Sequence, residues 1–507
     1  MLTWECRASN SHDNGTRARR ARLRDDEGPA CKQRAPVRRW NRRVDAMHGA
    51  QLDAVEREAD ARRHLLSPAE EMAKLGEESR PLLAYGEGIY VVDTRGRRLI
   101  DGPAGMWCTQ VGYARKEISD AIATQSMKLS YNSPWYTTNS PAAELAARIA
   151  EMTPGDLNRI FFTTGGSTAV DSALRFTEFY NNVLGRPAKK RIIVRKDGYH
   201  GSTNLTAACS GRAGNWPNFD IEQDRIAFIS SPNMRLADGK SEAEFLDHLV
   251  AEFQQKLDEL GADTVAAFLA EPLLASGGVI IPPKGYHARI KALCEQHDIV
   301  YISDEVVTAF GRCGEWFASE KMFGVVPDII TFAKGVTSGY VPLGGLAISE
   351  KLLARVSGDN AKGGYFTNGY TYTGHPVSCA AALANIAIIE DSNLLDHVRE
   401  MSEHFAAGLN SLADLPLVAD VRSSGLVGCV ECLADKSHVV ADDFDRKIGA
   451  RIDAICFDLG LIVRPIGHMC VLSPPLIITR EEIDRIIAIL RQGILQAADE
   501  LARGEIR

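Results

Sequence analysis

Two stretches decide the fold of this chain: HDIVYISDEV at residues 297–306 and PDIITFAKGV at residues 327–336. Each contains a short apolar run rich in β-branched residues, which is typical of a buried strand. The first run ends at Asp304 and the second at Lys334. About thirty residues separate the two, which is the length of one strand–helix–strand unit. Because ligands of open α/β sheets bind outside the carboxyl ends of the strands, both side chains are expected at a ligand site.

A carboxylate and an amine placed in this way suit one kind of cofactor. Pyridoxal phosphate has a ring nitrogen that a carboxylate can keep protonated and an aldehyde that an amine can capture. The pair alone does not decide the matter, because two charged residues at strand ends can also simply face solvent. The remaining motifs must therefore be weighed.

Outward from these stretches, strand and helix patterns alternate. Strand patterns occupy residues 156–164, 189–197, 263–272 and 301–305, and helix patterns occupy 167–182, 241–260 and 285–297. Such alternation predicts an α/β fold with a mostly parallel sheet covered by helices on both faces.

The chain is expected to divide into four parts. Residues 47–105 contain a helix pattern at 50–66 and a β-hairpin at 86–101, and we expect them to join a small domain. Residues 106–375 form the large cofactor-binding domain, and residues 376–507 form a smaller α+β domain that ends in a long helix. Residues 1–46 are a separate N-terminal extension.

The extension is rich in arginine, poor in apolar residues and without periodicity, so it is not expected to fold. It lacks the apolar segment of a secretory signal, and the acidic residues Asp25, Asp26 and Glu27 do not fit a mitochondrial transit peptide. Two interpretations stay open. Translation starts at Met47 and the upstream stretch is not native, or the stretch is a disordered native arm.

The composition predicts a globular protein of the cytoplasm. The 507 residues are 45% hydrophobic and 24% charged, which is near the globular average. A net charge of −8 argues against a nucleic-acid partner, and no apolar run is long enough to span a membrane. The 11 cysteines show no disulfide framework. Cys429 and Cys432 form a CxxC within an apolar stretch, and a core position is favoured over a metal or redox site.

A candidate phosphate site follows the first strand of the large domain. Residues 159–176 read RIFFTTGGSTAVDSALRF, which is a strand, two glycines, two hydroxyl residues and a helix. Gly165 and Gly166 allow close backbone approach, and the helix N-terminus attracts an anion. Taken alone, the turn is better explained by ordinary helix capping by Ser167 or Thr168. The lysine of a Walker A loop is missing.

Two further polar residues follow strands in the same half. Glu271 ends the strand VAAFLAEP, and Tyr199 follows the strand KKRIIVRKD. An aromatic ring at this place can stack on a flat cofactor. Taken singly, Tyr199 is better explained as a half-buried packing residue, and Glu271 as a helix-capping or ion-pairing residue.

Together these motifs resemble the class III pyridoxal-phosphate aminotransferases of fold type I, which include the amine:pyruvate and ω-amino acid:pyruvate transaminases. The resemblance runs from about residue 60 to the C-terminus. It is carried by DGPAGMWCTQVGY, FFTTGGSTAVDSALRF, GYHGST, FLAEP, YISDEVVTAFGRCGEWFA, PDIITFAKGVTSGYVPLGG, NGYTYTGHPVSCAAAL and LIVRPIGHMCVLSPPL, in that order.

The resemblance implies catalytic and cofactor-binding roles. Lys334 is the Schiff-base lysine, and Asp304 pairs with the pyridine nitrogen. Val306 packs on one face of the ring and Tyr199 on the other. Glu271 supports the site near the ring hydroxyl and Asp304. The cofactor is pyridoxal 5′-phosphate, and no metal is expected.

Other implied roles concern the phosphate and the second subunit. Gly166 and Ser167 hold the phosphate, and Thr371 reaches the cofactor phosphate of the neighbouring subunit. The active unit would therefore be a homodimer or a dimer of dimers. Many family members have Ser-Gly-Ser-Glu at the phosphate turn, whereas residues 165–168 here read Gly-Gly-Ser-Thr. This variant resembles a subgroup that contains taurine:pyruvate and bulky-amine enzymes.

The implied activity is ping-pong transfer of an amino group from an amine or ω-amino acid to a keto acid, with pyruvate expected before 2-oxoglutarate. Trp107 and Tyr136 would line the substrate pocket, and Arg464, in a loop-like setting after a strand, would bind the acceptor's carboxylate. An aminomutase or racemase of the same family is the alternative. A non-catalytic nucleotide-binding protein built on the Gly-Gly-Ser-Thr turn is a remote one.

Overall fold

The computed structural model describes residues 54–77, 80–361 and 364–506. The chain divides into two units, residues 1–79 and 80–507, which are described separately. In the first, α2 (Ala54–His64) lies within the helix predicted at 50–66, and the short 3-10 helix η1 (Met72–Lys74) follows it. The extension at 1–46 lies outside the described residues.

The largest sheet of the second unit has seven strands in the order β4-β10-β9-β8-β7-β5-β6. Their bounds are β4 (Arg159–Thr163), β5 (Arg191–Arg195), β6 (Ile226–Ile229), β7 (Val265–Ala270), β8 (Val300–Asp304), β9 (Ile329–Phe332) and β10 (Gly344–Ile348). The strands from β9 to β6 are mutually parallel, and β10 runs antiparallel to β9 and β4. The predicted mixed, mostly parallel α/β sheet is confirmed.

Both faces of the central strands are buried, because β7 is wholly apolar and β5, β8 and β9 are mostly apolar and buried. On one face, Ile192 and Ile302 pack with Leu174 of α6 (Gly166–Val183). On the other face, Phe268 and Tyr301 pack with α8 (Glu242–Leu260) and α9 (Tyr286–Gln296). Alternate residues of one strand thus enter two different cores, as expected for a sheet between two helix layers.

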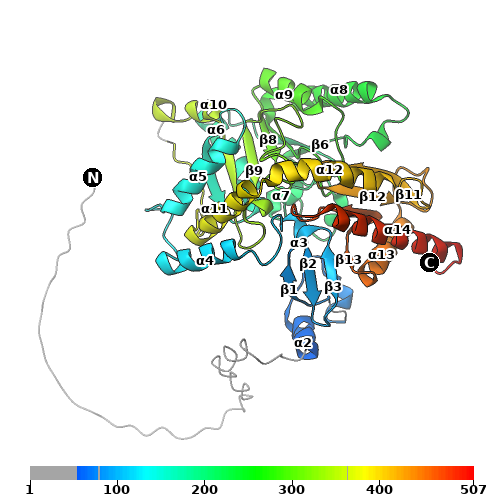
Figure 1. Ribbon diagram of the computed structural model, residues 1–507. Helices are drawn as coiled ribbons and strands as arrows, with labels where there is room; N and C mark the ends of the chain where they lie inside the picture. Colours follow the sequence, from blue (N-terminus) through cyan, green and yellow to red (C-terminus); the bar gives the residue numbers. More distant parts are fainter. Residues whose placement is uncertain (1–53, 78–79, 362–363, 507) are drawn as a thin grey trace, which may run out of the picture. The chain divides into compact units, whose positions relative to one another are not determined.

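The remaining helices between residues 104 and 391 are shorter than α6 and α8. They are α3 (Ala104–Trp107), α4 (Lys116–Lys128), α5 (Ser140–Met152), α7 (Asn204–Cys209), α10 (Glu350–Ala354) and α11 (Pro376–Asp391). Helices α4, α5 and α11 lie side by side (Figure 1). The 3-10 helices of this part are η2 (Ala213–Asn215), η3 (Met234–Leu236), η4 (Ala262–Thr264), η5 (Lys334–Thr337) and η6 (Gly358–Ala361).

Two four-stranded sheets complete the second unit. One is formed by β1 (Leu83–Glu87), β2 (Tyr90–Asp93), β3 (Arg98–Asp101) and β13 (Leu461–Ile462), and the other by β11 (Val418–Ser423), β12 (Gly428–Cys432), β15 (Met469–Leu472) and β14 (Arg464–Ile466). The β2–β3 hairpin was predicted, whereas β1 was not. Because β13 pairs in parallel with β3, the segment near residue 100 and the C-terminal part share one sheet. The exact domain boundaries stay a prediction.

The C-terminal helices are α12 (Leu394–Asn410), α13 (Asp443–Asp458) and α14 (Arg480–Ala502). Cys429 and Cys432 lie in β12 and are buried, and burial raises the pKa of the Cys429 thiol to about 12. This core position is the one that the sequence favoured. Within the described ranges, no helix combines the length and the apolar character that crossing a bilayer requires.

The packing of α8 on the sheet gives a prediction about stability. Phe253 is fully buried, and its ring meets that of Phe268 edge to face at 5.3 Å between centroids. We expect Phe253→Ala to lower the free energy of unfolding by about 3–5 kcal/mol, measured by urea denaturation followed by circular dichroism. Phe219→Ala is the control, because this ring is 73% exposed and its loss should cost little. Equal effects of the two changes would contradict the packing described.

Candidate active site

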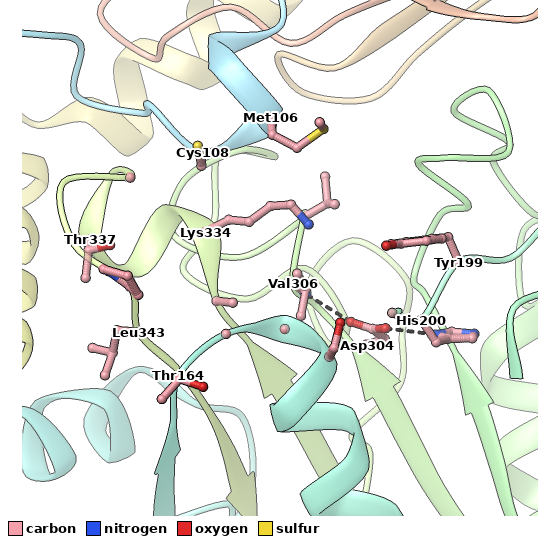
Figure 2. Close-up of a pocket in the computed structure, with 18 of the residues that line it drawn as sticks. Met106, Cys108, Thr164, Tyr199, His200, Asp304, Val306, Lys334, Thr337 and Leu343 are labelled. Carbon is pink, nitrogen blue, oxygen red and sulfur yellow. Dashed lines mark hydrogen bonds and ion pairs between the residues drawn. The ribbon is translucent and has the colours of Figure 1, made fainter. Parts of the chain in front are cut away.

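A cavity of about 370 Å³ opens at the carboxyl edge of the large sheet (Figure 2). This volume lies in the range of about 300–1,000 Å³ that is typical of small-molecule sites. Asp304 at the end of β8 and Lys334, two residues after β9, both line it. The two meet because β8 and β9 are parallel neighbours in which Asp304 pairs with Thr331. The juxtaposition that the two sequence stretches predicted is therefore present.

Asp304 is 5% exposed and has several hydrogen-bond partners. Its Oδ2 lies 2.8 Å from Nδ1 of His200, and its Oδ1 accepts from the backbone N–H of Val306 and from Oγ1 of Thr331, each at 3.2 Å. Burial of a carboxylate is costly unless such partners are present. The carboxylate is thus fixed in position at the floor of the cavity.

Lys334 is half-buried and begins η5, and Figure 2 shows its side chain extending into the cavity. Its backbone has a φ of 46°, which is the left-handed region that non-glycine residues rarely adopt. Burial lowers the pKa of its amine, while the negative charge of Asp304 acts in the opposite direction. Among the described residues, none accepts a hydrogen bond from Nζ. A larger neutral fraction makes this amine a better nucleophile.

Tyr199 and Glu271 lie on the same cavity, as the resemblance implied. Figure 2 shows the ring of Tyr199 across the cavity from Lys334. The backbone N–H of Tyr199 donates to Oε1 of Glu271 at 3.0 Å, and the N–H of Ala275 donates to Oε2 at 3.0 Å. Burial raises the pKa of Glu271, and the nearby Asp304 adds to the rise.

The predicted phosphate turn borders the cavity at the start of α6. Gly166 begins the helix, whose first N–H groups have no intrahelical partner. Oγ of Ser167 accepts from the backbone N–H of Ser202 at 3.0 Å, which joins the turn to the GYHGST segment. A Cβ on Gly201 would lie 2.4 Å from Oγ1 of Thr206, so only glycine fits there. Val306 faces Gly166 from the opposite side.

The predicted substrate residues are not placed as simply. Trp107 is 2% exposed and belongs to an apolar cluster, while its neighbours Met106 and Cys108 line the cavity instead. Tyr136 is 90% exposed, and Thr371 is exposed as well, and neither lines the cavity of this chain. Their predicted roles stay predictions.

Arg464 requires a correction, because it was expected in a loop. It is the first residue of β14 and pairs with Val471 of β15. Its guanidinium lies 5.0 Å from the centroid of the Trp107 ring, and Nη1 contacts Sδ of Met106. The sequence signal for a loop was Pro465, but proline is allowed at a sheet edge. Arg464 thus lies beside the cavity, in contact with Met106, which lines it.

No role was predicted for His200 and Thr331, which hold the Asp304 carboxylate. A signal was present for both. His200 follows Tyr199 in the same GYHGST segment, and Thr331 is the only polar residue in the apolar run IITF. No group of histidine, cysteine and acidic side chains suited to a metal ion occurs in the part of the chain that the structure describes.

Comparison with known proteins gives the family. The model of the class III aminotransferases matches residues 76–494. Putrescine–pyruvate aminotransferase of Pseudomonas aeruginosa is 36% identical over 447 residues, covering 87% of this chain and 96% of the relative. Mitochondrial gamma-aminobutyrate transaminase 1 of Oryza sativa subsp. indica is 36% identical over 425 residues, covering 83% of this chain and 82% of the relative.

Solved structures agree with this result. An (S)-enantioselective omega-transaminase from Thermomicrobium roseum superposes with a TM-score of 0.85 and 33% identity, over 88% of this chain and 99% of the other. The fold is therefore that of the fold-type I transaminases. The cavity with its lysine and carboxylate, the matching family model and these relatives lead to one conclusion: the chain belongs to the class III aminotransferases.

Proposed function

We propose that this aminotransferase moves an amino group from an amine or ω-amino acid to pyruvate, in two half-reactions carried by pyridoxal 5′-phosphate on Lys334. The single observation that supports this most is the meeting of Lys334 and Asp304 on one cavity. The family makes transamination the activity. The residue roles, the acceptor and the dimer are our inferences.

The residues present fit this cofactor. The first backbone N–H groups of α6 have no intrahelical partner, which suits a phosphate. Beside them, the chain packs so closely at Gly201 that a Cβ does not fit. Tyr199 and Val306 border the cavity and suit the two faces of a flat ring. Asp304 suits a ring nitrogen. Gly166 and Ser167 would hold the phosphate, and Glu271 would support the ring hydroxyl.

When bound, the cofactor supplies an electron sink for the carbon that carries the amino group. Asp304 keeps a proton on the ring nitrogen, and His200 and Thr331 hold the carboxylate in place. Nζ of Lys334 takes the proton from the substrate carbon, as a general base with a lowered pKa. A positioned base of this kind contributes about 10²–10⁴ in rate.

Arg464 would bind the carboxylate of the keto acid, and its contact with Met106, which lines the cavity, supports this role. A guanidinium binds a carboxylate through two parallel hydrogen bonds. Thr371 and Tyr136 are exposed and lie away from the cavity of their own chain. We propose that in a homodimer they reach the site of the neighbouring subunit.

The test of the proposed function is Lys334→Ala. Without the amine, turnover and the absorbance of the covalently bound cofactor should both disappear, while the circular dichroism spectrum stays unchanged. Lys321→Ala is the control, since this lysine is 67% exposed and pairs with Glu315. Half-reaction rates of Lys334→Ala equal to those of the unaltered protein would refute the assignment.

A second prediction concerns the phosphate cradle. An added Cβ at Gly201 would meet Thr206 and Ser167 and would strain a backbone with a φ of 143°. Gly201→Ala should weaken cofactor binding by about tenfold or more, because strain of this kind costs on the order of 1–3 kcal/mol. Titration of the cofactor-free protein with pyridoxal phosphate measures this. Gly214→Ala, where a Cβ would meet nothing within 4 Å, should bind as before.

A third prediction concerns Arg464. Arg464→Ala should raise the KM for pyruvate, since a lost charged hydrogen-bond pair costs about 1.5–3 kcal/mol. The half-reaction with 1-phenylethylamine, which has no carboxylate, should change far less. Stopped-flow absorbance separates the two half-reactions. Equal damage to both would mean that Arg464 supports the fold or the cofactor.

A further inference from the structure

Arg212 carries a positive charge to which neither the fold nor the proposed reaction assigns a role. It precedes η2, is half-buried and borders a second cavity of about 420 Å³. Ser276 lines both this second cavity and the active-site cavity. Arg212 therefore borders a cavity that adjoins the active-site cavity at Ser276.

The charge of Arg212 is not balanced by a direct partner. The other arginines that line the second cavity are paired: Arg422 with Asp420 and Glu431, and Arg446 with Asp443. By contrast, no carboxylate among the described residues forms an ion pair with the Arg212 guanidinium, and no described residue accepts a hydrogen bond from it.

Two other carboxylates, those of Glu271 and of Asp197 at the edge of the same second cavity, form no ion pair with it. Asp197 and Glu271 act on Arg212 only through their electrostatic field, and burial is the largest influence on its pKa, which is lowered. A half-buried cation without a partner costs free energy. A bound anion would remove that cost.

Arg464 makes the case stronger, because its guanidinium is also without a carboxylate partner in the described ranges. Burial lowers the pKa of Arg464, and the positive charge of Arg212 lowers it further. Tyr199 exerts an electrostatic effect on both arginines. Two cations without an ion-pair partner among the described residues thus lie near the Tyr199 ring that borders the active-site cavity, close enough to repel one another.

We propose that Arg212 binds a second anionic group of the substrate, so that this enzyme takes dicarboxylic keto acids or amino acids in addition to pyruvate, with Arg464 holding the other carboxylate. The inference rests on the proposed function and adds a substrate class to it. A monocarboxylic acceptor such as pyruvate would use Arg464 alone. A diamine would bring a second ammonium group toward two cations and would be disfavoured.

The test uses the cofactor-loaded enzyme and two unreactive acids, glutarate with two carboxylates and butyrate with one. Their dissociation constants are measured by calorimetry, which does not depend on turnover. We expect glutarate to bind more tightly than butyrate, and Arg212→Gln to reduce the ratio of the two affinities on the order of tenfold, as for a lost charged hydrogen bond. Arg212→Lys should restore part of it.

Arg446→Gln is the matched control, because Arg446 borders the same second cavity but already pairs with Asp443. It should leave the ratio unchanged. An unchanged ratio in Arg212→Gln, or an equal change in Arg446→Gln, would overturn the inference. The first outcome would mean that Asp197 and Glu271 suffice to balance Arg212.

Two kinetic arms separate donor from acceptor. In one, 2-oxoglutarate is compared with pyruvate against 1-phenylethylamine; in the other, glutamate is compared with alanine as donor. A loss of dicarboxylate preference in Arg212→Gln, in either arm, supports the inference. The arm in which it occurs shows whether Arg212 binds the acceptor or the donor. Absence of turnover with every pair in the unaltered enzyme would refute the proposed function, whereas the binding ratio would still decide the role of Arg212.

Discussion

A buried carboxylate needs hydrogen-bond donors around it, and the site of this enzyme depends on how Asp304 meets that need. Its partners come from three places in the chain: His200 after β5, Val306 just beyond β8, and Thr331 within β9. Each partner thus links a different strand, or the segment that follows it, to the Asp304 carboxylate. The cavity can therefore keep its shape only while β5, β8 and β9 keep their mutual order in the sheet.

The antiparallel strand β10 completes this arrangement. It starts at the edge where the parallel strands end, so its first residue, Gly344, lies against the turn that begins α6. A Cβ at Gly344 would be 2.6 Å from the backbone oxygen of Gly165. Gly344 therefore packs directly against the backbone of the turn at Gly165. A strand of opposite direction thus acts on the same edge of the sheet as the strands that carry Asp304 and Lys334.

The parts of the site that the sequence predicted are those that follow from backbone direction alone. Asp304 and Lys334 each end an apolar run, and parallel neighbours must bring such ends together. Trp107 was harder, because its backbone has an unusual φ of 60° and its ring is buried in an apolar cluster, while Met106 and Cys108 line the cavity. Arg212 has no pattern around it, since its unpaired charge is a property of the folded surroundings. A role for such a residue becomes visible only in the folded structure.

At Lys334 the proposed catalytic role and the structural preference of the backbone oppose each other. Its left-handed backbone would suit glycine or asparagine far better than lysine, and it carries a strain on the order of 1–3 kcal/mol. A search for stabilising changes that considered only the folded state would therefore select its replacement. A change that would relieve backbone strain here would thus remove the amine that the proposed chemistry requires, so stability has to be gained at a distance from this turn.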